Sequence, residues 1–131
     1  MSKLANAYAL IIGVGNDLPT TVLDATAIYN ILVDEKLAGY PEENIILLTE
    51  KNATREGILS SFDQLIEKID EDSSVMLFYS GHGGFYEPWN QFYLVPNDFD
   101  ADEYDTTWVK AEELKEKIFT GEANNDAQKL S

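Results

Sequence analysis

The sequence contains no cysteine, and this absence excludes more than any other feature of its composition. The 131-residue chain can form no disulfide bond and has no thiol of its own to act as a nucleophile. It has a single histidine, His82, so the usual ligands of a structural zinc site are missing. It also lacks an apolar run of membrane-spanning length, and residues 1–6 lack the apolar core of a secretion signal. These absences predict a cytoplasmic protein that does not enter membranes.

Basic residues are scarce as well. Nine lysines and arginines stand against 24 aspartates and glutamates, which gives a formal net charge of −15. A chain of this charge repels phosphate groups, so we expect neither nucleic acid nor an anionic membrane surface as a partner. Basic peptides would be attracted, although an acidic balance is also common among soluble proteins. The length suits one domain, and a hydrophobic share of 44% is enough for a folded core.

Apolar runs separated by amphipathic segments organise the first two thirds of the chain. Between the runs, apolar residues recur at helical spacing over Val22–Leu37 and, after a capping Thr54, along a stripe that reaches Ile69. Continuous apolar runs of this kind are typical of strands that are covered on both faces in a parallel sheet. The predicted strands are Tyr8–Val14, Asn44–Leu48 and Val75–Tyr79.

This alternation predicts an α/β fold with a mostly parallel sheet and helices on both faces. A short strand over Phe92–Val95, a helix over Ala111–Phe119 and a flexible tail over 121–131 are expected to follow. In such sheets, functional sites lie beyond the carboxyl ends of the strands. The loops over 16–24 and 80–84 both lie at that edge, so the geometry permits them to share one site.

His82 lies between glycines directly after the third apolar run. An unperturbed histidine, with a pKa of about 6.5, is largely neutral at physiological pH and can accept a proton from a nucleophile. Flanking glycines let a substrate backbone approach closely and leave main-chain N–H groups available to an oxyanion. An ordinary histidine without a catalytic role is the competing interpretation of a lone imidazole.

Two other chemistries are disfavoured by the motifs present. Gly13-Val-Gly15 after a strand lacks the third glycine of a dinucleotide-binding loop, and the following Asn16-Asp17 would face a phosphate poorly. A serine hydrolase built on Ser80 would lack the Gly-x-Ser-x-Gly elbow.

Six segments, taken in order, resemble a known family. They are Tyr8–Gly15, Leu23–Ala25, Asn44–Thr49, Ala53–Arg55, Val75–Gly83 and Tyr93–Asp98. This set is similar to the large-subunit region of the caspase-like clan of cysteine peptidases, closest to metacaspases and bacterial caspase-like peptidases. The resemblance implies that residues 1–120 form a large-subunit-like region of a caspase-like three-layer sandwich, incomplete without a further segment. Separase-like and gingipain-like peptidases share the histidine signature but fit the Asp24 region less closely.

The resemblance implies a role for four residues. His82 matches the catalytic histidine, and the Gly83 N–H matches an oxyanion donor. Asp24 and Ser80 match walls of the S1 pocket, where a carboxylate would select arginine or lysine at P1. Alternatively, Asp24 is a helix-start carboxylate favoured by the helix dipole. The only arginine, Arg55, belongs to the start of the second helix, which disfavours cleavage after aspartate.

In the family the nucleophilic cysteine follows on the next strand, which this sequence does not contain. We therefore expect a C-terminal segment of the same protein, or a second chain, to supply the thiol. This chain alone would be inactive and would leave a strand edge open to pairing with that partner. The alternative is a non-catalytic caspase-like module with a binding or regulatory role.

Calcium is the one cofactor that the resemblance to metacaspases suggests. Asp98 matches a calcium-binding carboxylate of metacaspases, but Lys110 and Ala111 occupy the place of the expected aspartate pair. The acidic run over 100–105 is typical of a solvated loop. Asp98 is thus only a weak calcium candidate, and no cofactor is expected to be required.

Overall fold

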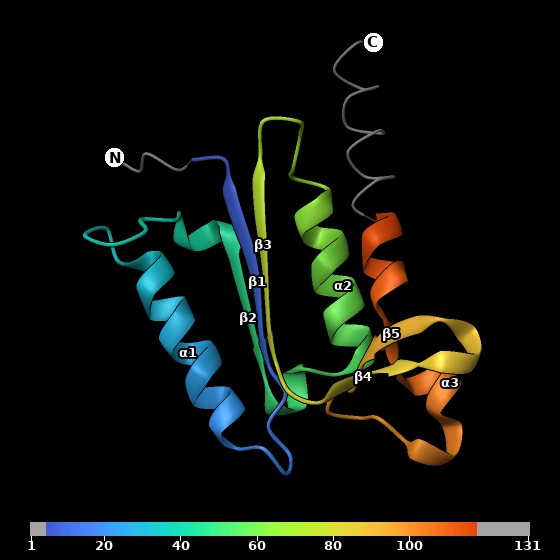
Figure 1. Ribbon diagram of the computed structural model, residues 1–131. Coiled ribbons are helices and arrows are strands. Elements are labelled where there is room, and N and C mark those ends of the chain that lie inside the picture. The colour runs from blue at the N-terminus through green and yellow to red at the C-terminus, as the bar shows by residue number, and fades with distance from the viewer. Residues whose placement is uncertain (1–4, 118–131) are drawn as a thin grey trace.

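The computed structural model describes residues 5–117, which form three layers around a parallel sheet. The sheet contains β1 (Ala7–Gly13), β2 (Ile45–Thr49) and β3 (Ser74–Ser80) in the order β2-β1-β3 (Figure 1). All three predicted strands are confirmed to within about a residue at each end. β3 pairs with β1 alone among the described residues, so the sheet is open on that side.

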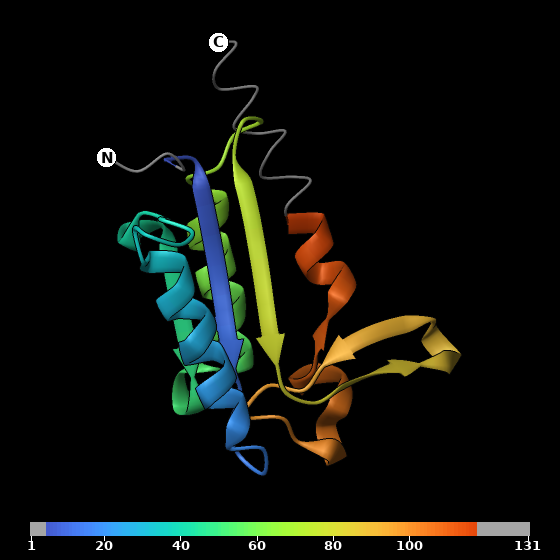
Figure 2. The same ribbon diagram turned by 60° about the vertical axis from the view of Figure 1, so that its left-hand side comes forward.

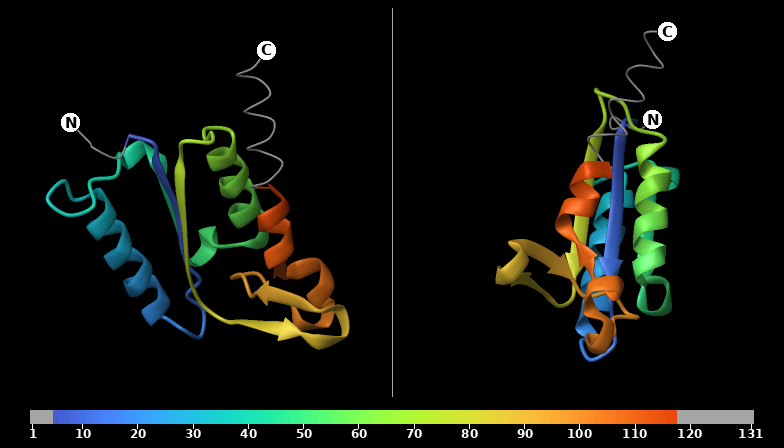
Figure 3. Two further views of the ribbon diagram at one scale, coloured as in Figure 1. Left: turned by 45° about the horizontal axis from the view of Figure 1, so that its top comes forward. Right: turned by 90° about the vertical axis from the view of Figure 1, so that its right-hand side faces the viewer.

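Helices cover both faces of the sheet, as predicted. α1 (Thr20–Val33) packs on one face and α2 (Arg55–Ile66) on the other (Figure 3). Because successive side chains of a strand point to opposite faces, β1 contributes to two separate cores. The α1 side buries Ala9, Ile11, Ala25, Leu32 and Ile45. The α2 side buries Leu10, Ile12, Val14, Leu48, Ala53, Ile58, Phe62, Leu65, Val109 and Leu114.

The helix boundaries follow local capping chemistry. The predicted Thr54 cap is confirmed, because its hydroxyl accepts a hydrogen bond of 3.0 Å from the Gly57 N–H. The predicted end of the first helix at Leu37 is wrong, since α1 ends at Val33. There the Asp34 carboxylate accepts the Lys36 N–H at 2.9 Å and stabilises a turn in place of a further helical turn. α1 also begins two residues before the predicted Val22.

A second, antiparallel sheet follows the parallel one. It contains β4 (Gly83–Tyr86), β5 (Gln91–Leu94) and β6 (Val109–Lys110) in that order. The prediction of a short strand near 92–95 is confirmed as β5, whereas β4 and β6 were not predicted. The β4–β5 hairpin projects from the carboxyl ends of β1 and β3 (Figure 2). Short helical turns flank β2 of the first sheet, at Glu42–Asn44 and Glu50–Asn52. Others connect the strands of the second sheet: Glu87–Trp89, Ala101–Glu103 and α3 (Tyr104–Thr107).

Trp108 forms the centre of the second sheet's own core and is only 2% exposed. Its ring lies 5.1 to 5.7 Å, centroid to centroid, from four other aromatic rings, those of Tyr86, Trp89, Tyr93 and Tyr104. Arg55 ties this unit to α2, because its guanidinium donates to the Trp108 carbonyl at 3.2 Å and pairs with Glu113 at 3.1 Å. The second sheet is therefore fixed against the parallel sheet through the first residue of α2.

Helical structure resumes at residue 111 and continues to 117, the last described residue. The predicted helix over 111–119 is confirmed over that range, while residues 118 and 119 and the predicted tail 121–131 lie outside the described residues. Leu114 packs into the core on the α2 side, and Lys117 pairs with Asp63 of α2 at 2.7 Å. Within residues 5–117, no helix is both long and apolar enough to cross a bilayer.

Candidate active site

The carboxyl ends of β1 and β3 lie side by side, which brings the two predicted loops together. Gly13 and Ser80 are register partners, and the Val14 N–H donates to the Ser80 carbonyl at 3.1 Å. The chain leaves both strands at the same edge (Figure 2). The prediction that these loops lie at one edge of the sheet is confirmed.

His82 occupies a two-residue link between β3 and β4. The expected loop over 80–84 is thus too long, because Ser80 ends β3 and Gly83 already begins β4. The Val95 N–H donates to the His82 carbonyl at 3.0 Å, and the Tyr79 hydroxyl donates to the same carbonyl. The backbone is held in this way while the imidazole remains about half exposed. His82 is therefore fixed at its main chain and accessible at its side chain.

Close packing explains the glycine before the histidine. A Cβ at Gly81 would lie 2.8 Å from both the Tyr79 hydroxyl oxygen and the Val14 Cγ2 atom. Burial raises the pKa of Tyr79 to about 12, so its hydroxyl stays protonated and continues to donate at neutral pH. Tyr79 and Gly81 together set the path of the main chain into His82.

The position of the Gly83 N–H follows from the register of β4 and β5. Hydrogen-bonded and non-hydrogen-bonded pairs alternate along an antiparallel ladder. Since the Val95 N–H bonds to His82, the next pair, Gly83 with Leu94, is of the non-hydrogen-bonded kind. The Gly83 N–H therefore points away from β5, next to the histidine. This orientation leaves it able to donate to an incoming oxygen atom.

Ser80 and Asp24 meet although they are 56 residues apart. The Ser80 hydroxyl donates to Asp24 Oδ2 at 3.2 Å, between the last residue of β3 and an exposed position of α1. The first turn of α1 contains no acidic residue, so Asp24 lies beyond the region where a carboxylate caps the helix. The geometry gives no support to the helix-start alternative for Asp24.

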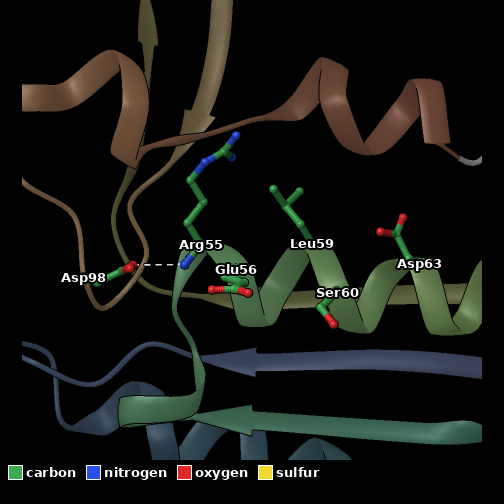
Figure 4. Close-up of a pocket in the computed structure, with 6 residues that line it drawn as sticks. All are labelled: Arg55, Glu56, Leu59, Ser60, Asp63 and Asp98. Carbon is green, nitrogen blue, oxygen red and sulfur yellow. Dashed lines mark hydrogen bonds between the residues drawn. The ribbon is translucent and has the colours of Figure 1, made fainter.

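Asp98 has a structural partner. Its Oδ1 accepts the Arg55 N–H at 2.9 Å and so caps the start of α2 (Figure 4). It borders an open cavity of about 420 Å³, together with Arg55, Glu56, Leu59, Ser60 and Asp63. Among residues 5–117, no three carboxylate or imidazole side chains cluster closely enough to hold a metal ion. The acidic run over 100–105, which follows Asp98, contains two short helical turns, and its aspartates are exposed.

Comparison with known proteins supplies the family. The family model of the peptidase C14 caspase domain matches residues 6–126 of this chain. The chain belongs to this family of cysteine peptidases. It is 32% identical over 111 residues to Metacaspase-1 of Eremothecium gossypii, and 32% identical over 108 residues to Metacaspase-1 of Saccharomyces cerevisiae. These alignments cover 76% and 74% of this chain but only 22% of the length of each relative.

The sandwich described above is accordingly a caspase-like α/β fold whose sheet is open at β3. Beside the His82 loop of this caspase domain lies an open groove of about 510 Å³. Two exposed rings on its wall, those of Phe85 and Phe92, are in contact at a tilt of 54°, with centroids 4.7 Å apart. The groove is lined by Tyr79, Gly81, Gly83, Gly84, Phe85, Phe92, Tyr93, Leu94 and Ala111.

Sequence reasoning missed one polar residue of the caspase site. Asp17, in the loop after β1, places Oδ2 3.0 Å from His82 Nε2. The hydrogen bond from His82 lowers the pKa of this carboxyl from its ordinary value. A polar residue in a loop at the carboxyl edge of the sheet was the available signal, but 65 residues separate the two partners in the chain. No local pattern could connect them.

Proposed function

We propose that this chain is the histidine-bearing part of a cysteine endopeptidase that cleaves after arginine or lysine. The nucleophilic cysteine would come from a C-terminal segment of the same protein or from a second chain. Together with this chain, that partner makes the assembled enzyme. The observation that carries the proposal is the contact between Ser80 and Asp24 at 3.2 Å, adjacent to the loop of His82. The family resemblance implies that both residues line the S1 pocket, and although they come from separate segments they are in contact with each other.

The charge of this contact favours a basic P1 side chain. Asp24 is an exposed carboxylate, and Ser80 is its hydrogen-bond partner. An arginine or lysine side chain in this pocket would gain a charge-assisted hydrogen bond once water is excluded. The only arginine of the chain, Arg55, is engaged by Glu113 and the Trp108 carbonyl. It is not available to select an acidic P1 residue.

Catalysis would then follow the chemistry of a cysteine–histidine pair. His82 takes the proton of the cysteine thiol, and the thiolate sulfur forms a bond to the scissile carbonyl carbon. The Gly83 N–H, with a donor near the cysteine, stabilises the resulting oxyanion. Collapse of this intermediate breaks the C–N bond, and the proton held by His82 goes to the leaving amine. Water, deprotonated by His82, hydrolyses the thioester and restores the thiol.

The open side of β3 supports a strand-forming partner. Leu77, in the middle of β3, is 39% exposed although it lies within the strand's apolar run, residues 75–79. A strand added along β3 would cover this face and pair the edge, and the adjacent groove beside Gly83 could receive its continuation. A thiol carried at the end of that strand would lie at the same sheet edge as His82. The proposal assigns no cofactor to this chain, and activity should survive removal of calcium.

The second candidate is a non-catalytic caspase-like module that binds a partner or regulates one. The absence of cysteine from the sequence favours it. Under this alternative the groove and the β3 edge would still bind a partner, but no thiol would reach His82.

Substrate selectivity tests the proposal most sharply at Asp24. In the assembled enzyme, Asp24→Asn should lower kcat/KM for arginine and lysine substrates by about 10- to 100-fold, because one charge-assisted contact is lost. Substrates with a neutral P1 residue should lose little. The matched control is Asp34→Asn, an exposed aspartate just past the other end of α1, which should leave selectivity unchanged. Unaltered selectivity in Asp24→Asn would overturn the pocket assignment.

A further inference from the structure

We infer that Asp17 is a positioning residue for His82: its carboxylate accepts the Nε2–H of the imidazole and so turns Nδ1 toward the nucleophile. Nothing in the sequence or the family match assigns a role to this residue. The inference about the contact stands by itself, while its catalytic consequence rests on the proposed function. Asp17 touches neither substrate nor nucleophile in this scheme and acts only through His82.

The contact is a direct hydrogen bond between the two side chains. Asp17 Oδ2 lies 3.0 Å from His82 Nε2, with the imidazole 54% and the carboxylate 73% exposed. An exposed pair of this kind ordinarily contributes little to stability, because solvent screens it and two side chains lose freedom. We expect the pair to fix the orientation of the His82 imidazole instead, which requires that the loop holding Asp17 is itself fixed.

That loop is held by hydrogen bonds on both sides of Asp17. The Leu18 N–H donates to the Gly15 carbonyl at 3.0 Å, which closes a tight turn around Asn16 and Asp17. The Thr21 hydroxyl accepts the Gly15 N–H at 2.8 Å. Gly15 itself has a φ of +77°, a conformation that favours glycine. The turn therefore presents Asp17 from a defined backbone.

A second set of contacts ties the same turn to the chain after β5. The Asn16 side chain donates to the Asn97 carbonyl at 2.8 Å, and the Asn97 side chain donates back to Asn16 Oδ1 at 3.0 Å. Asn97 also donates to the Val14 carbonyl at 2.9 Å. The Asp17 turn and the His82 backbone are thus both anchored to residues 95–97, since Val95 bonds to the His82 carbonyl. This shared anchor keeps the distance between carboxylate and imidazole set.

The chemical consequence concerns the tautomer of His82. A neutral imidazole carries one N–H and one lone pair, and the hydrogen bond at one nitrogen decides the role of the other. A carboxylate at Nε2 stabilises the Nε2–H form, which leaves the Nδ1 lone pair to accept a thiol proton. After that transfer the same carboxylate stabilises the imidazolium. The ring orientation and the tautomer of His82 would both be set by one side chain.

The contact can be tested in the 131-residue chain without any nucleophile, because His82 is its only histidine and gives one unambiguous set of imidazole signals. In NMR spectra the Nε2–H proton should be visible in the wild type and lost in Asp17→Ala. The Asp17 carboxyl should titrate below the ordinary aspartate range, and its pKa should return to that range in His82→Ala. The control is Asp72→Ala, an exposed aspartate in the turn before β3, at the opposite end of that strand. Ordinary titration of Asp17 together with an unchanged imidazole spectrum in Asp17→Ala would overturn the inference.

The positioning role is tested in the assembled enzyme. Asp17→Ala should lower kcat by about 10- to 100-fold with KM changed by less than about threefold, because orientation matters in the chemical step more than in binding. Asp17→Asn should recover part of the loss, since its amide oxygen still accepts the Nε2–H, and Asp72→Ala should match the wild type. Full kcat in Asp17→Ala would overturn the positioning role while leaving the proposed function intact. A wild type without any peptidase activity would overturn the proposed function, and with it the catalytic role, although the NMR contact would stand.

Discussion

β1 and β3 are neighbouring parallel strands of equal length with very different surroundings. Each has seven residues, each is apolar along most of its length, and they pair in register from Ala7–Ser74 to Gly13–Ser80. β1 has a partner on both sides and is buried almost throughout, whereas β3 has β1 alone and is partly exposed at every position. Similar sequences therefore occupy a central and an edge position in one sheet.

The composition of β3 differs from that of a typical edge strand. Edge strands in soluble proteins are commonly short, charged or interrupted, which discourages pairing with other chains. β3 is none of these, and it presents Val75, Leu77 and Tyr79 on the face toward α2. A strand of this composition fits a position that is covered on both sides. This supports the proposal that a cysteine-bearing segment pairs along β3.

The contrast between β1 and β3 can be tested by making the same substitution at two paired positions, one in each strand. Leu10 of β1 and Leu77 of β3 are register partners on the same face, and they are 0% and 39% exposed. Leu10→Ala should lower the free energy of unfolding by about 2 to 5 kcal/mol, because it leaves a cavity in a closed core. Leu77→Ala should cost no more than about 1 kcal/mol in the chain alone. Denaturant unfolding of both variants measures the difference.

In the assembled enzyme the cost of Leu77→Ala should rise toward that of Leu10→Ala, because the added strand covers Leu77. Equal costs in the chain alone would mean that β3 is already buried, and the contrast between the strands would fail. An unchanged cost on assembly would argue against pairing along β3.

A smaller effect is expected at the carboxyl end of β3, where the Tyr79 side chain is partly buried. Tyr79→Phe removes a hydroxyl that bonds to the His82 and Val95 carbonyls and should cost about 1 to 2 kcal/mol. Burial raises the folded-state pKa of Tyr79 to about 12, while the unfolded value is near 10. Above a pH of about 10 the unfolded chain therefore loses this proton first, and stability falls as the pH rises toward 12.

Alkaline unfolding curves of wild type and Tyr79→Phe check this sign. The variant should lack the part of the alkaline loss that Tyr79 causes, so the two curves should converge between pH 10 and 12. Parallel curves would show that the hydroxyl is not buried as described, and that β3 is open along its whole length.

The three parallel strands could be predicted because each is a continuous apolar run, which is visible in the local sequence alone. The end of α1 was missed because the Asp34 turn, a side-chain-to-backbone bond, competed with helical spacing that continued to Leu37. β4 was missed because its two glycines have little strand propensity, and its pairing with β5 alone decides its conformation.

For the site, the shared sheet edge followed from topology, and the roles of His82, Gly83, Asp24 and Ser80 came from the family resemblance. Asp17 was not predictable, since its contact depends on how two distant loops are anchored. The Asn16–Asn97 hydrogen bonds that provide this anchoring join residues 81 positions apart.

The central claim is that His82 serves a thiol supplied from outside these 131 residues. The most direct measurement is hydrolysis of fluorogenic peptides with arginine, lysine or aspartate at P1 by the assembled enzyme, with and without iodoacetamide, beside its His82→Ala variant and this chain alone. We predict turnover of the arginine and lysine peptides only by the untreated assembled enzyme, with at least about a 1,000-fold loss in His82→Ala. Turnover that persists in His82→Ala, or that resists alkylation of the thiol, would contradict the account.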